Sequence, residues 1–97
     1  MTTSSDTLKD PTLLHQIARA YEHRGEIQHA LEHYQASLHA APDYIEAHHN
    51  LGQLFLKTNH LDAAIKQFNN VLALNPQHTN AHFYLGVAYL MQEKLEP

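Results

Sequence analysis

The 97-residue chain has no cysteine and no tryptophan. The lack of cysteine excludes a disulfide framework, a thiolate zinc site and a thiol nucleophile. No apolar run reaches the roughly 18 residues that a membrane-spanning helix requires, and residues 1–10 lack the apolar stretch of a signal peptide. These absences favour a cytoplasmic protein that does not cross a membrane.

Basic side chains are also scarce, with six Lys and Arg against ten Asp and Glu. No helix face gathers them into a stripe, so we expect no nucleic-acid partner. Histidine, by contrast, occurs ten times, and protonation of all ten would take the formal net charge from −4 to +6. The surface potential should therefore change sign in mild acid.

Motifs of the common catalytic sites are missing as well. The sequence has no glycine-rich phosphate loop, no Gly-x-Ser-x-Gly elbow and no His-Glu-x-x-His pair. Its carboxylates occur singly on expected helix exteriors, where such groups are normally solvated. We therefore expect a protein that is not an enzyme and that needs no cofactor.

What the sequence does contain is a repeat with a period of about 34 residues, a length typical of stacked helical hairpins. The segment Leu51–Phe55 recurs one period later at Leu85–Tyr89, and a weaker copy lies one period earlier at Ile17–Tyr21. In each copy a small residue precedes an aromatic one, at Ala18 and Tyr21, Gly52 and Phe55, and Gly86 and Tyr89.

Apolar spacing within the repeat predicts five helices. Asp10 and Pro11 form a good helix start, and Gly25 provides a stop. Short connections between the helices require antiparallel neighbours. The expected helices cover 11–23, 27–40, a segment that begins near Glu46, 61–74 and 79–92, after a flexible leader at 1–10.

With this pattern the chain resembles the tetratricopeptide repeat family. The resemblance covers a domain at 11–97, with repeats at 11–44 and 45–78 and a partial repeat at 79–97. It implies an all-α, right-handed α-solenoid of antiparallel helix hairpins, with about two and a half repeats.

The chain departs from the family at single positions. Leu14, His48 and His82 stand where the family usually has tryptophan. Asn59 and Glu93 replace the inter-helix glycine that Gly25 retains.

In this family the first helices of successive hairpins line a concave groove that binds peptides or protein segments. The resemblance therefore implies a non-enzymatic protein-interaction module with a protein or peptide partner. The groove residues that it implies are His15, Arg19, Glu22, Glu46, His49, Asn50, Gln53, Lys57, Asn80, Phe83 and Val87.

The last helix is expected to lack a mate, because another second helix is due where the sequence stops at Pro97. We favour a fragment of a longer repeat protein. Self-association is the competing expectation, and a homodimer would then bury the edge formed by Leu85 and Tyr89. A further alternative function is a scaffold or oligomerisation segment appended to a downstream enzyme domain such as a transferase.

Histidine pairs are candidate metal ligands. His29 and His33, like His78 and His82, stand four residues apart, a spacing that lets two imidazoles share a metal. No cysteine and no well-placed third carboxylate completes a site. The sequence therefore predicts no metal centre.

Overall fold

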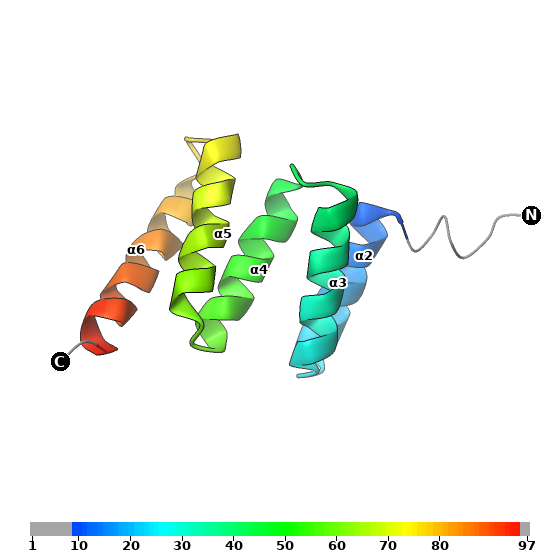
Figure 1. Cartoon of the computed structure of the whole chain (residues 1–97), viewed down its shortest axis with the longest axis horizontal. Helices are drawn as coiled ribbons and strands as arrows, with labels where there is room; N and C mark the ends of the chain where they lie inside the picture. The colour runs from blue at the N-terminus through cyan, green and yellow to red at the C-terminus, as the bar shows by residue number, and fades with distance from the viewer. Residues whose placement is uncertain (1–8, 96–97) are drawn as a thin grey trace, which may run out of the picture. The chain divides into compact units, whose positions relative to one another are not determined.

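The protein is described by a computed structural model over residues 9–95, apart from the side chain of Leu95. That part of the chain contains five α-helices and no strand (Figure 1). None of these helices combines the length and the apolar character that crossing a membrane would need. The helices are α2 (Pro11–His23), α3 (Ile27–Ala40), α4 (Ile45–Lys57), α5 (Leu61–Leu74) and α6 (Thr79–Leu95).

The chain divides into two compact units, Met1–Ala47 and His48–Pro97, with the boundary inside α4. In the first unit α2 packs against α3. In the second unit α5 packs against α6. Completely buried residues lie in each unit, namely Ala18, Ala30, Tyr34, Ser37 and Ala47 in the first and Leu54, Ala64, Phe68, Val71, Ala81 and Ala88 in the second.

The start of α2 follows directly from two residues. The Asp10 carboxylate accepts hydrogen bonds from the backbone amides of Thr12 at 3.0 Å and Leu13 at 3.4 Å. Pro11 occupies the first turn, where its missing N–H costs nothing. The helix start predicted from the sequence is confirmed. Most of the predicted leader, residues 1–8, lies outside the described part of the chain.

Replacing Asp10 by alanine is expected to lower the free energy of unfolding by about 1 kcal/mol, because two backbone amides lose their acceptor. Urea unfolding followed by circular dichroism measures the change. Asp10→Asn keeps an acceptor oxygen and should retain most of the stability. An unchanged stability in Asp10→Ala would show that the cap does not stabilise α2.

The turns between paired helices use backbone conformations that favour glycine. Gly25 has φ of 78° and Asn59 has φ of 64°. Asparagine is among the few non-glycine residues that adopt this left-handed region readily. The third equivalent residue, Glu93, lies inside α6, which continues to Leu95. The predicted end of this helix at Gln92 is therefore wrong, because no turn forms there.

Candidate functional site

A cluster of aromatic rings surrounds His15 in the first unit. The ring centroid of His15 lies 5.9 Å from that of Tyr34 and 5.1 Å from that of Tyr44. The Tyr44 hydroxyl is 3.2 Å from His15 Nδ1. Only 5% of His15 is exposed. His15 is thus a core residue, and the prediction that it offers its side chain to a partner is corrected.

Burial lowers the pKa of His15 below its usual 6.5; the negative charge of Glu46 partly opposes this shift, and the positive charge of Arg19 reinforces it. Burial also raises the pKa of the Tyr34 hydroxyl, and so does its hydrogen bond to Glu22. This hydroxyl donates to Glu22 Oε1 over 2.7 Å. Glu22, which is half-buried, is thus tied to the core through Oε1, and its place in the groove stays a prediction.

The pH dependence of stability should carry a contribution from His15. Because the folded-state pKa lies below 6.5, the unfolded chain takes up a proton first as pH falls through 6.5. The free energy of unfolding then declines with falling pH. We expect the stability of the parent to fall more steeply between pH 7 and pH 5 than that of His15→Gln.

Urea titrations of the parent and of His15→Gln at several pH values test this expectation. The other nine histidines are present in both proteins, so a difference between the two pH profiles reports on His15. Parallel pH profiles for the parent and His15→Gln would contradict it.

An equivalent ring cluster occurs one period later in the second unit. His49 lies 5.7 Å from Phe68 and 5.1 Å from His78, measured between ring centroids. His49, Phe68 and His78 each stand one repeat period after His15, Tyr34 and Tyr44. We call these two sets the ring triplets. The sequence shows the repeat at the first two positions of each triplet, where His15 matches His49 and Tyr34 matches Phe68. At the third position Tyr44 and His78 share only an aromatic ring, so the sequence does not predict this part of the cluster.

The second unit brings together part of the predicted groove. His49 on α4 lies 5.6 Å from Tyr84 on α6, so these two helices are neighbours at this level. Tyr84 also stacks on Phe68 at 5.9 Å. Beside these rings, Asn50, Gln53 and Val87 are half-buried, and Lys57, Asn80 and Phe83 are exposed. We call the surface formed by Asn50, Gln53, Asn80 and Val87 the α4–α6 surface.

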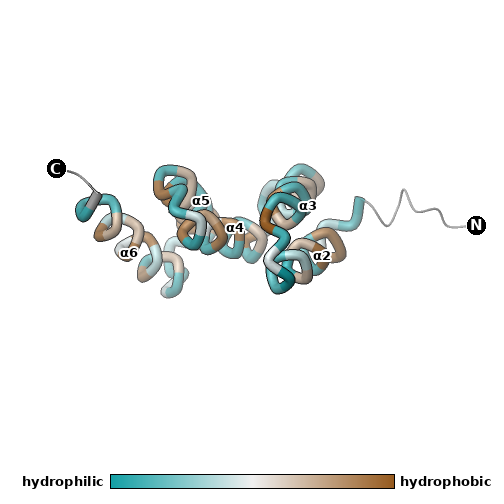
Figure 2. The backbone as a smooth tube through the Cα atoms, turned by 90° about the horizontal axis from the view of Figure 1, so that it is seen from below, coloured by the Kyte–Doolittle hydropathy of each residue, from teal (hydrophilic) through white to brown (hydrophobic). Residues whose placement is uncertain are grey.

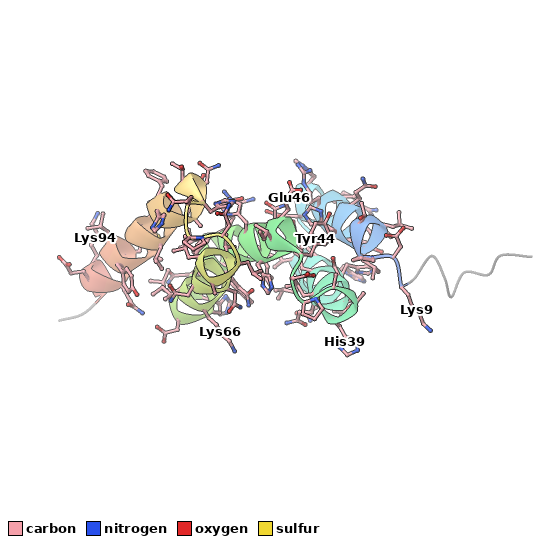
Figure 3. The ribbon with its side chains drawn as sticks, turned by 90° about the horizontal axis from the view of Figure 1, so that it is seen from above. Lys9, His39, Tyr44, Glu46, Lys66 and Lys94 are labelled. Carbon is pink, nitrogen blue, oxygen red and sulfur yellow. The ribbon has the colours of Figure 1, made fainter. Side chains whose placement is uncertain are left out.

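The remaining groove residues lie in the first unit. Arg19 on α2 and Glu46 on α4 are exposed. Tyr44 and Glu46, labelled in Figure 3, lie just before and just inside the start of α4. A positively charged side chain, Arg19, and a negatively charged one, Glu46, thus belong to the predicted binding face of this unit.

The outward side of α6 carries several exposed apolar residues. Phe83 is 64% exposed, Tyr89 51% and Leu90 60%. Figure 2 shows hydrophobic residues recurring along α6. Of the predicted self-association edge, Tyr89 is exposed and Leu85 is half-buried.

The paired histidines have structural contacts of their own. The rings of His29 and His33 lie 4.9 and 5.1 Å from the Tyr21 ring. His78 Nδ1 accepts the backbone N–H of Ala81 at 3.0 Å, which caps the start of α6. Within residues 9–95, no group of three or more histidine or acidic side chains could hold a metal ion.

These observations define a class of protein: helical hairpins, all-α over residues 9–95, in which the same ring packing occurs in two successive repeat periods. Two family models, both described as tetratricopeptide repeat, match residues 11–54 and 49–96. The chain belongs to the tetratricopeptide repeat family.

Several curated proteins have similar sequences. BBSome complex member bbs-4 of Caenorhabditis elegans is 32% identical over 81 residues, which is 84% of this chain and 18% of that protein. Superkiller protein 3 of Saccharomyces cerevisiae is 28% identical over 74% of this chain and 5% of its own length. Anaphase-promoting complex subunit CDC16 of the same yeast is 30% identical over 90% of this chain and 11% of its own length. The chain thus spans less than a fifth of each of these relatives.

A solved structure shows the same fold. The crystal structure of MamA superposes with a TM-score of 0.86 at 20% sequence identity, over 89% of this chain and 47% of MamA. The likeness confirms the fold class predicted from the sequence, an all-α solenoid of helical hairpins.

Proposed function

We propose that this chain is a non-enzymatic protein-interaction module that binds a protein segment on the α4–α6 surface. The observation that carries the proposal is the contact between His49 and Tyr84. This contact joins α4, which carries Asn50 and Gln53, to α6, which carries Asn80, and it supports a surface with side-chain amides from both helices. Amide groups both donate and accept hydrogen bonds, as the backbone of a bound segment requires.

The exposure pattern supports the same proposal. Asn80 is exposed, while Asn50 and Gln53 are half-buried. Aromatic rings next to partly exposed polar groups are typical of recognition surfaces. Two of the similar proteins are themselves named as members of complexes, the BBSome and the anaphase-promoting complex.

Asn80→Ala combined with Gln53→Ala tests the proposal. We expect the immobilised parent to capture a partner from a lysate of the source cells, identified by mass spectrometry, and the double variant to lose most of that capture. Removing two amides from a binding surface costs about 1–2 kcal/mol in total, or roughly a tenfold loss in affinity.

Asn69→Ala is the matched control, because Asn69 is an exposed asparagine on α5 in the same unit. It should capture as much partner as the parent does. Equal capture by the parent and the double variant would place binding elsewhere on the chain and overturn the proposal. The thermal unfolding of all three proteins must agree for the comparison to hold.

A further inference from the structure

Two histidines at the start of α6 make hydrogen bonds of opposite sense. His78 immediately precedes α6, and its Nδ1 lies 3.0 Å from the backbone nitrogen of Ala81. An amide N–H can only donate, so His78 Nδ1 is an acceptor and carries no proton. One turn later, His82 Nε2 lies 2.8 Å from the carbonyl oxygen of Pro76. A carbonyl can only accept, so His82 Nε2 carries a proton and donates it.

The two hydrogen bonds therefore respond differently to acid. An imidazole takes up its second proton between about pH 8 and pH 5, and both ring nitrogens are then donors. The bond from His82 to Pro76 survives this change, because the new proton binds the other ring nitrogen. The bond at His78 does not survive it, because the lone pair that accepts the Ala81 amide is the one that takes the proton.

The amide that would lose its acceptor is buried. Ala81 is completely buried, and its N–H is one of the four at a helix start that have no acceptor within the helix. A buried donor left without an acceptor costs more than the hydrogen bond itself contributes. A proton on His78 would also place positive charge at the N-terminus of α6, where the helix dipole disfavours it.

Within residues 48–94, the described part of the second unit, no acidic side chain near His78 offsets that charge. His49 from α4 approaches it with ring centroids 5.1 Å apart, so the facing group is a second imidazole. Asp62 and Glu93 lie near the far ends of α5 and α6, about 20 Å along the helices from His78. Glu46, in the first turn of α4, belongs to the first unit. The basic side chains of the second unit also lie toward those far ends, namely Lys57, Lys66 and Lys94.

We propose that His78 is a pH-sensitive cap: protonation of its Nδ1 releases the Ala81 amide, opens the first turn of α6 and weakens binding at the α4–α6 surface. The link to binding rests on the function proposed above. Asn80 of that surface is the second residue of α6, directly before Ala81, so it moves with the turn. His49 contacts the rings of both His78 and Tyr84, so the change at the cap also reaches the ring cluster beside the surface. A segment bound at neutral pH is therefore released in mild acid.

Hydrogen exchange of the isotopically labelled chain, followed by nuclear magnetic resonance, tests the cap without any partner. We expect the protection of the Ala81 amide, corrected for the intrinsic exchange rate, to fall about tenfold in the parent between pH 7 and pH 5. The amide of Val71, in the buried core of α5, is the reference for a general loss of stability and should lose much less.

Two variants assign the effect to His78. His78→Asn keeps a capping oxygen that does not titrate, so the protection of Ala81 should be the same at both pH values. His82→Gln is the matched control and should show the fall seen in the parent. The proposal is overturned by unchanged protection of Ala81 in the parent, by an equal fall at Val71, by an equal fall in His78→Asn, or by loss of the fall in His82→Gln.

Partner capture at the same two pH values tests the link to binding. At pH 5 the immobilised parent should retain about a tenth of the partner that it captures at pH 7, whereas His78→Asn should retain most of it. Equal retention by the two proteins would overturn the link. A lack of capture at both pH values would contradict the function proposed above, while the exchange measurement still decides the cap.

Discussion

Replacing Phe68 by alanine is expected to lower the free energy of unfolding by about 3–5 kcal/mol, a large part of the stability of a small domain. The ring is completely buried. It contacts the rings of His49 and Tyr84 and lies against the α4 backbone at Gly52. Truncation would leave a cavity that none of these neighbours can fill without moving. Urea unfolding monitored by circular dichroism gives the change.

Phe83→Ala serves as the control for this loss, because Phe83 is 64% exposed. Removing an exposed ring should alter the free energy of unfolding by no more than about 0.5 kcal/mol. If the two substitutions cost the same, the core assigned to the second unit would be wrong.

Replacing Gly52 by leucine should destabilise the protein by about 1–3 kcal/mol, although leucine is the better helix former. Even the first atom of the new side chain would approach the Phe68 ring to 2.8 Å. The ring cannot turn aside cheaply, since it is enclosed on all sides. Chemical unfolding of the variant and the parent measures the cost.

Two further variants isolate the clash at Gly52. Gly86→Leu adds the same side chain to an equivalent helix position where nothing lies within 4 Å. It should leave stability unchanged or raise it by up to about 1 kcal/mol, the gain in helix propensity. In a Phe68→Leu background, the cost of Gly52→Leu should shrink, because the rigid ring is gone. An undiminished cost there would mean that the strain arises elsewhere in α4.

Much of the fold could be predicted from the sequence, because helix periodicity and helix ends are local signals. The start of α2 at Pro11 depends on Asp10 immediately before it, and both lie in one short segment. The predicted end of α6 is wrong for the opposite reason. The repeat register predicts a turn at Glu93, but no glycine or asparagine there provides the left-handed conformation of Gly25 and Asn59.

The candidate site was less accessible to sequence reasoning. Position in the repeat indicates which helix face a residue belongs to, but not how deeply its side chain is packed. The sequence predicts His15 as a polar residue of the groove, whereas two tyrosines enclose it. Tyr44 comes from the connection before α4 and carries no periodic apolar signal. Contacts of this kind depend on tertiary packing and become visible only in the structure.

The duplication of the ring triplets has a consequence for how the chain reaches its native state. Tyr34 and Phe68 present nearly interchangeable rings, and Gly52 and Gly86 present equivalent receptors for them. A frame-shifted intermediate would place the Tyr34 ring on Gly52 and the Phe68 ring on Gly86, and would leave α2 without its native partner. Such a trap is a recognised hazard of repeat proteins. Three residues, 24–26 and 58–60, separate each native pair, and four, 41–44 and 75–78, separate each frame-shifted pair. Loop closure therefore favours the native pairs by only about 0.3 kcal/mol, and the close fit of Phe68 on Gly52 must supply the rest of the discrimination.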